Sequence, residues 1–366
     1  MASVYPGNLG GTFGADIASV TRLATSAPFS KYLAEEIYER SLFIKSGALA
    51  TSAALNNTIG TRIEVPFFNS LSTTAETVRS DNTWGTSGAG HLTAQKVTAA
   101  TQYASIMHRG FAYAMDDLSR YQTNEDALNF VRSQMAQDVD RINTTSIVSM
   151  LTGIVGPGGP LAATNALDVS EATAGSETEA NFLSAATVTA AKYLLGERAT
   201  SVTTLVVHPT VAAYLEQVGM LQFSSTALAT GSGIQWGGGG IGVTNTQVGA
   251  AFGLNVVVDS QLPIRGSTGE NEQYVCYIMG NGALQTGSQY PLTVGSDYNL
   301  LSFQTEMAVK YSNVFHIPGV SWSASSDNPE DTDLATPGNW TLVFQEPKLI
   351  PVVELTVNSP FGGVLP

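Results

Sequence analysis

The sequence predicts an α+β fold from three observations. A long amphipathic helix occupies the middle of the chain, from Asn124 to Gly153. A polar gap separates two extended runs before that helix, which indicates a two-stranded β-ribbon. Short strands interleaved with a few helices occupy residues 199–298, and a β-rich tail follows.

Apolar residues recur at spacings of three and four through the central helix, which gives it one apolar face. These residues are Leu128, Val131, Met135, Val139, Ile142, Ile147, Met150 and Leu151. About 28 helical residues at about 1.5 Å each make a rod of about 42 Å. Thr123 with Asp126 predicts a capping box, and Gly153 with Gly156 predicts the stop. This length is typical of a strut across a wide, thin domain, although an ordinary long core helix fits the same pattern.

The composition indicates a chain with an unusually uncharged surface. Its 366 residues are enough for two or three domains. Charged residues make up 13%, against about 25% in typical soluble domains. A surface buried against other copies in a large assembly explains this bias. A secreted, Ser/Thr-rich adhesion protein would show the same bias, so this alternative stays open.

The net charge of −14 and the lack of a basic cluster argue against proteins that track nucleic acid by displacing counterions. An acidic wall can still enclose nucleic acid without binding a particular sequence. The single cysteine, Cys276, lies in an apolar run and is expected to be a buried, inert thiol. With no signal-peptide pattern and no membrane span visible, we expect a soluble protein made in the cytoplasm.

The first part of the chain predicts an arm, a helix and the ribbon. Residues 1–27 resemble an extended arm, and Pro28–Lys45 has the pattern of a short amphipathic helix. Alternation over Thr61–Phe67 predicts a strand that its proline places at a sheet edge. The return run is Leu92–Met107. The segment between them, Asn69–Gly90, is polar and has almost no residues that could form a core.

We interpret these two runs as the strands of a projecting ribbon. A two-stranded ribbon alone is only marginally stable in water, so it is expected to lie on a neighbouring subunit. The candidate inter-subunit contacts near its tip are Glu76, Arg79, Asp81 and Trp84. The charged side chains would pair at the rim of the contact, and the tryptophan would anchor it. A disordered flap is the alternative.

After the central helix, the pattern predicts two helices, at Phe182–Gly196 and Thr210–Val218. Strands are predicted at Leu205–Pro209, Gly253–Ser260, Tyr274–Gly280, Ala283–Gly287, Asn339–Phe344 and Leu349–Val357. Ser232–Gly242 is expected to be a flexible glycine loop, and residues 325–338 a loop rich in turns.

The sequence contains no constellation that supports catalysis. The histidines, which are His91, His108, His208 and His316, have no metal-ligand spacing, and no glycine is followed by lysine as a phosphate loop requires. His208 is expected to satisfy a backbone group at the end of a strand. The paired carboxylates, Asp116 with Asp117 and Asp138 with Asp140, are expected to lie on surfaces or caps. We therefore expect no enzyme, no metal and no cofactor.

Five strings resemble a known family when they are taken in order. They are TRIEVPFFNSLS, AYAMDDLSRY, NFLSAATVTAAKYLLGERATSVTTLVVHPTVAAYLEQ, FGLNVVVDSQLP and NWTLVFQEPKLIPVVELTVN, which together span most of residues 55–357. The chain resembles the major capsid proteins of tailed double-stranded DNA bacteriophages, which have the Hong Kong 97-like fold. The resemblance implies an N-terminal arm at 1–57, an extended loop at 58–109, a peripheral domain with the spine helix at 110–198 and 299–366, and an axial domain at 199–298.

The resemblance implies a structural shell protein of the virion that assembles with itself into hexamers and pentamers around DNA. Scaffolding, portal and possibly cement proteins would be its partners, and no membrane is implied. Some members join neighbours through a lysine of the extended loop, but here the loop tip has no lysine and Lys96 lies in the return run. We therefore expect no covalent cross-link, and because no long charged helical extension is visible at the N-terminus, a separate scaffolding protein is expected. An encapsulin-like compartment is the alternative shell.

Overall fold

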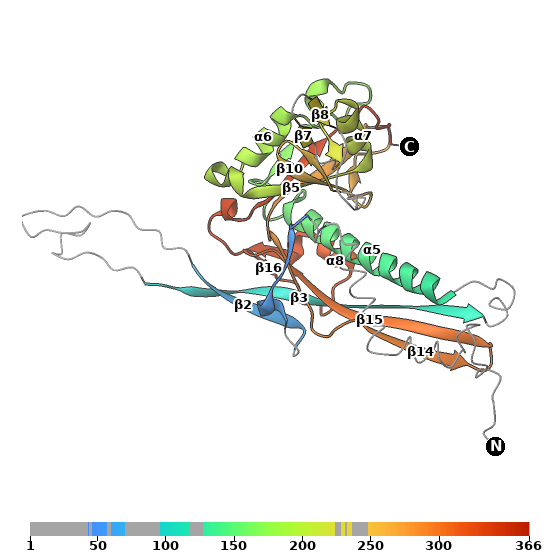
Figure 1. Cartoon of the computed structure of the whole chain (residues 1–366). Helices are drawn as coiled ribbons and strands as arrows, with labels where there is room; N and C mark the ends of the chain where they lie inside the picture. Colours follow the sequence, from blue (N-terminus) through green and yellow to red (C-terminus); the bar gives the residue numbers. More distant parts are fainter. Residues whose placement is uncertain are drawn as a thin grey trace, which may run out of the picture.

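The computed structural model describes residues 43, 46–56, 60–69, 96–116, 127–223, 228–230, 233–235 and 248–365. These residues form two large β-sheets, with the long helix α5 lying between them (Figure 1). One sheet is drawn out into a long, narrow blade, and the other forms the core of a rounder body above it.

The blade is a six-stranded sheet with the order β1-β13-β15-β3-β2, and β14 pairs with β15 at the side. Its strands are β1 (Leu49–Thr51), β2 (Arg62–Phe68), β3 (Ala99–Asp116), β13 (Leu284–Gly287), β14 (Thr293–Asn299) and β15 (Gln304–His316). The antiparallel pairing of β2 with β3 confirms the predicted strands of the ribbon. The strand β3 continues past the predicted end at Met107 and pairs with most of β15.

The rounder body contains an eight-stranded mixed sheet with the order β4-β18-β12-β5-β10-β9-β6, and β11 pairs with β12. Its strands are β4 (Ala166–Asp168), β5 (Val202–Val207), β6 (Gln222–Phe223), β9 (Val248–Ala251), β10 (Leu254–Val258), β11 (Ile264–Arg265), β12 (Gln273–Gly280) and β18 (Val352–Val357). The central strands are nearly continuous apolar runs because both faces of this sheet are covered.

Four α-helices and two small sheets complete the described residues. The helices are α5 (Ala127–Val155), α6 (Ala185–Tyr193), α7 (Pro209–Gln217) and α8 (Asp331–Ala335). The small sheets pair β16 (Val320–Trp322) with β17 (Trp340–Leu342) and β7 (Leu228–Thr230) with β8 (Gly233–Gln235). Short 3-10 turns lie at Ala53–Leu55, Glu179–Asn181, Gly196–Ser201, Pro337–Asn339 and Pro347–Leu349.

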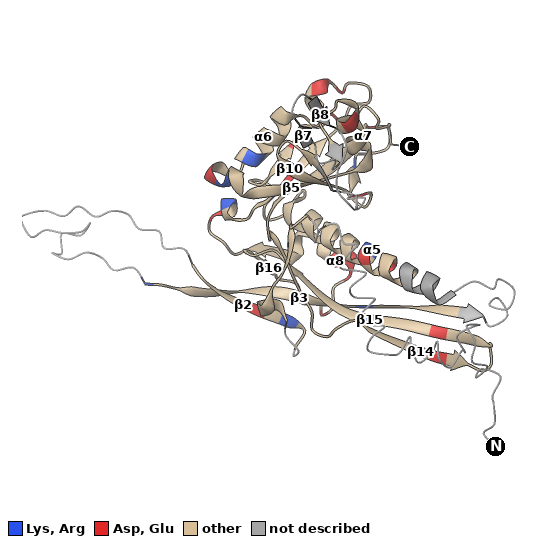
Figure 2. Ribbon diagram, viewed as in Figure 1, with Lys and Arg blue, Asp and Glu red and all other residues tan. Residues whose placement is uncertain are grey.

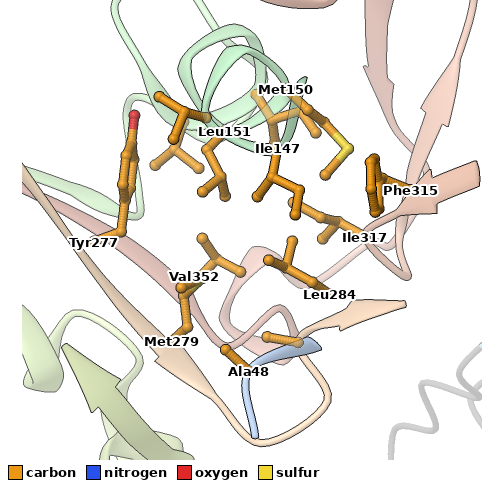
Figure 3. Packing of buried hydrophobic residues seen from close by; sticks show 14 of the residues in the cluster. Ala48, Ile147, Met150, Leu151, Tyr277, Met279, Leu284, Phe315, Ile317 and Val352 are labelled. Atoms are coloured by element: carbon orange, nitrogen blue, oxygen red, sulfur yellow. The ribbon is translucent and has the colours of Figure 1, made fainter. Parts of the chain in front are cut away.

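The helix α5 uses its two halves differently. Met135 and Val139 in its first half pack on the blade, beside Met307 and Val309 of β15. The second half lies in a core that contains residues of both sheets. In that core Ile147, Met150 and Leu151 converge with Tyr277, Met279, Val352, Leu284 and Phe315 (Figure 3). The prediction of a strut is thus consistent with its position between two sheets.

A second core lies on the far face of the eight-stranded sheet, under α6 and α7. Ser184 and Thr187 form a capping box that starts α6. His208 caps α7, because its Nδ1 accepts a hydrogen bond from the Thr210 N–H at 3.3 Å. Both helices therefore begin at signals that are present in the sequence.

The predicted stop of α5 is confirmed at Gly156, because the helix ends at Val155, whereas Gly153 lies inside the helix, where a Cβ would be 2.2 Å from the Leu334 carbonyl. Two further local predictions were wrong in detail. Pro209 does not end a strand: β5 ends at Val207, and the proline is the first residue of α7, where it needs no N–H partner. The expected loop at 325–338 contains helix α8.

Other predictions lie partly or wholly outside the described residues. The capping box before α5 and nearly all of the expected helix at Pro28–Lys45 fall outside them. In the expected glycine loop, Gly233–Gln235 forms β8 instead, because it pairs with β7, and residues 236–242 are not described.

Candidate assembly surfaces

The four residues predicted to make inter-subunit contacts, Glu76, Arg79, Asp81 and Trp84, lie outside the described residues. The described chain on either side of them is the end of the blade where β2 and β3 pair. The pairing continues one step past the strands, since the Asn69 N–H donates to the Thr98 carbonyl at 3.0 Å and the two side chains bond at 3.0 Å.

This end of the blade is fastened to the segment around β16. The Tyr103 N–H donates to the Ser321 hydroxyl at 2.9 Å, and Arg62 donates to the Ala324 carbonyl. Phe67 meets Phe344 edge to face, with 5.3 Å between the ring centres. Hydrogen bonds and aromatic packing therefore fix β2 and β3, from which the predicted loop projects, to the segments around β16 and Phe344.

Large apolar side chains are exposed at both ends of the blade. Phe68 and Val97 lie at the end formed by β2 and β3, and Leu300, Leu301 and Phe303 lie at the tip of the hairpin formed by β14 and β15. Monomeric proteins rarely expose large contiguous apolar patches, and such patches mark sites of contact with other molecules. This hairpin, formed by β14 and β15, was not among the strands predicted from the sequence. Its signal was the alternation of Thr305, Met307, Val309 and Tyr311 with exposed residues.

Charged residues are few and scattered along the described part of the chain, as Figure 2 shows. The best-buried ion pair joins Arg265 of β11 to Glu354 of β18, with two oxygen–nitrogen distances of 2.5 and 3.1 Å. A second group ties the blade to α5 and α8: Arg109 and Ser146 both donate to the Asp331 carboxylate, at 3.3 and 2.7 Å. These pairs hold elements of one subunit together and are not free to bind a partner.

Among the residues considered for catalysis, His91 and Asp117 lie outside the described residues, and Cys276, His208, His316 and Asp138 are described. Burial raises the pKa of the Cys276 thiol to about 12, so it stays protonated and unreactive. His208 caps α7 as expected, and its pKa is lowered by burial. His316 is buried with both ring nitrogens unpaired, and burial lowers its pKa to about 4. The Asp138 carboxylate accepts hydrogen bonds from Tyr113 and Gln134 and pairs with Arg141.

The described residues contain no group of three or more histidine, cysteine, aspartate or glutamate side chains that could hold a metal ion. None of their helices combines the length and the hydropathy that a membrane crossing requires.

The fold is shared with solved phage capsids. The capsid of Ralstonia phage GP4 aligns with a TM-score of 0.53 at 10% identity, covering 87% of this chain and 92% of that one. The capsid of cyanophage Pam1 aligns with a TM-score of 0.51 at 12% identity, covering 87% and 92%. The fold is therefore the Hong Kong 97-like capsid fold, as the sequence predicts.

The sequence is also similar to that of a phage capsid protein. The major capsid protein of Bacillus phage SPP1 is 23% identical over 339 residues, which are 89% of this chain and 94% of the relative. No family model matches the chain. Fold and sequence together confirm the resemblance to phage major capsid proteins, and the chain is a structural protein of the virion capsid. Capsid proteins of this kind are not enzymes, in agreement with the sequence analysis.

Proposed function

We propose that this capsid protein assembles with itself into hexamers and pentamers, which close an icosahedral phage head around double-stranded DNA. The observation that carries the proposal is the similarity to a phage major capsid protein over 89% of this chain and 94% of the relative. The described residues contain two large sheets and the long helix α5 between them.

The shape of the subunit suits a tile. The helix α5 has 29 residues, which at about 1.5 Å each gives about 44 Å, and it runs along the blade. Contacts between unlike faces of identical copies generate closed rings when the rotation between copies closes. An elongated subunit with exposed apolar ends can make such contacts with neighbours on both sides.

We place the axial domain of the proposed shell at 199–298 and the peripheral domain at 110–198 and 299–366. Two of the apolar cores support two units, since one underlies α6 and α7 and another lies between α5 and the blade, while the core around the second half of α5 joins both sheets. The packing crosses the proposed bounds: α6, β4 and β18, outside 199–298, belong to the rounder body, and β13 and most of β14, inside 199–298, belong to the blade. The axial units would meet around the ring centres.

The extended loop at 58–109 is proposed to reach the adjacent subunit, with Glu76, Arg79, Asp81 and Trp84 as its contacts. Deleting residues 72–88 tests this role. The deleted chain should keep the circular dichroism spectrum and unfolding midpoint of the wild type, because the fastenings of β2 and β3 lie outside the deletion. It should form no particles by electron microscopy. Normal particles from the deleted chain would refute the role.

The proposed partners are scaffolding, portal and possibly cement proteins, besides other copies of the chain. Contact with DNA is expected to be independent of sequence, since the net charge is −14 and the sequence has no cluster of lysines and arginines. A mobile genome is easier to pack and to release than one bound to its wall.

Expression with the candidate scaffolding protein, followed by negative-stain microscopy, tests the whole proposal. We expect closed particles of uniform size. Particles isolated from infected cells should in addition protect their DNA from nuclease. Particles that hold protein cargo and no DNA would favour the encapsulin-like alternative. A subunit that stays single at every concentration and salt, with or without the scaffold, would refute assembly.

A further inference from the structure

The tip of the β14–β15 hairpin is the most apolar exposed feature of the described residues. Leu300, Leu301 and Phe303 are 74%, 96% and 64% exposed, and they lie within four consecutive positions. Burial of apolar surface is worth about 25 cal/mol per Å², so burying these three side chains would contribute several kcal/mol of favourable free energy. A single exposed leucine needs no explanation, but three at one tip mark a contact site.

The turn that presents these side chains is held by hydrogen bonds. The Asn299 side-chain oxygen accepts from the Leu301 N–H at 3.1 Å and from the Ser302 N–H at 3.4 Å. Phe303 has a φ of +50°, a left-handed conformation that costs free energy for a bulky residue. The tip is thus a formed turn in which the apolar groups point outward.

A pair of carboxylates lies directly behind the tip. Asp297 of β14 and Glu306 of β15 are paired opposite each other, and both are exposed on the face of the blade away from α5. Like charges opposite each other on adjacent strands destabilise a sheet. A cationic group of another molecule would relieve this repulsion. This end of the blade therefore combines an apolar tip with two carboxylates that a positive charge would stabilise.

The other end of the blade has the complementary features. Phe68 and Val97 are 76% and 62% exposed, and Lys96 beside them is exposed as well. Phe68 pairs with Ala99, so Val97 continues the same face as its diagonal neighbour. The flexible four-carbon stem of the lysine lets its ammonium group reach a carboxylate beside this apolar pair.

The two ends cannot meet within one chain. The strand β3 spans both, since Ala99 is opposite Phe68 and Asp116 is opposite Gln304. Its 18 residues, at a rise of about 3.3 Å per residue, separate the ends by about 59 Å. Contact between two tips would bring the carboxylates of two copies together. Contact of a tip with the Lys96 end pairs opposite charges instead.

We propose that the β14–β15 tip of one copy docks on the β2–β3 end of a second copy, with Leu300, Leu301 and Phe303 against Phe68 and Val97, and the carboxylates near Lys96. This contact is heterologous, because it joins two different surfaces. Each copy can bind one neighbour through its β14–β15 tip and another through its β2–β3 end, so the contact can repeat from copy to copy. It deepens the proposed self-assembly and rests on it.

Cysteine cross-linking tests the contact. Cys276 is buried and stays unreactive, so wild-type thiol chemistry does not interfere. Particles carrying both Leu301→Cys and Val97→Cys, treated with a short bis-maleimide, should give a ladder of dimers, trimers and higher multimers on a denaturing gel. Each single variant should stay monomeric. Dimers from Leu301→Cys alone would show contact between tips and refute the proposal, as would intact double-variant particles without a ladder.

Charge reversal gives an independent test. Glu306→Lys and Lys96→Glu should each lower particle yield at low salt by about tenfold, and their combination should return it to within about twofold of the wild type. Glu197→Lys, which reverses an exposed charge outside both ends of the blade, is the control and should assemble normally. Wild-type yields from both charge variants would refute the docking contact alone. Failure of the wild type to form any particle would instead refute the proposed assembly.

Discussion

The second half of α5 and the tip of the blade contain the same kinds of residue in opposite environments. Ile147, Met150 and Leu151 are buried where both sheets meet, and no solvent reaches them. Leu300 and Leu301 are exposed at the end of the long hairpin. Burial stabilises the subunit in the first region, whereas in the second it would be gained only against another molecule. The fold of the subunit and its assembly thus depend on separate sets of apolar residues.

The largest expected contrast comes from one substitution made in each region. Leu151→Ala should lower the free energy of unfolding by about 4 kcal/mol, because it leaves a cavity in a core that cannot easily collapse. Leu301→Ala should change it by less than about 0.5 kcal/mol, because the side chain is in water. Urea unfolding of the unassembled subunits measures both. Equal losses would mean that the tip belongs to the core of the subunit.

The buried ion pair beside the core should rank next. Glu354→Gln leaves the Arg265 guanidinium without its bidentate partner and should cost about 3 kcal/mol. The matched control is the surface pair of Arg141 with Asp138, at 3.3 Å, where Arg141 is 67% exposed. Arg141→Gln should cost less than about 0.5 kcal/mol. A small effect at Glu354 would show that the sheet of the rounder body tolerates an unpaired charge.

Adding one methyl group at each of two glycines compares the two regions again: Gly153 lies in the core and Gly295 in the exposed hairpin. Gly153→Ala would place a carbon 2.2 Å from the Leu334 carbonyl and 2.8 Å from Trp340 Nε1, the two groups that bond to each other. A loss of about 2–3 kcal/mol is expected, despite the gain of about 1 kcal/mol in helix propensity. Gly295→Ala, on the open face of β14, meets nothing within 4 Å and should be nearly neutral. Thermal unfolding of both variants measures the difference.

The smallest expected effect depends on pH. His316 is buried without hydrogen-bond partners, and its pKa falls from 6.5 to about 4. The unfolded chain therefore binds a proton that the folded chain does not between those pH values, so this contribution to stability is full above pH 6.5 and is lost as pH falls towards 4. About 2 kcal/mol should be lost between pH 7 and 5.

The matched variant for this pH dependence is His316→Phe, which removes the titrating group. Its urea midpoint should fall less steeply between pH 7 and 5 than that of the wild type. His208, whose pKa is also lowered, remains in both proteins and cancels in the difference. Identical slopes would show that the histidine finds a partner in solution.

The sequence by itself determined the elements whose signals are local. The spacing of Met135, Val139 and Leu151 predicted α5, and the apolar runs of β12 and β18 predicted buried strands, because such patterns reflect contacts within a few residues or a continuous burial. The ordered strings also predicted the capsid fold, which the comparisons confirm.

Only the tertiary structure decided what each end of those elements does. Gly153 has the sequence signature of a helix end, but the approach of Leu334, far along the chain, makes it a packing position inside α5. The pairing of β3 with β15 joins strands that are far apart in the chain, and no local pattern encodes it. The order of the strands decides which apolar residues are buried and which remain exposed at the two ends of the blade.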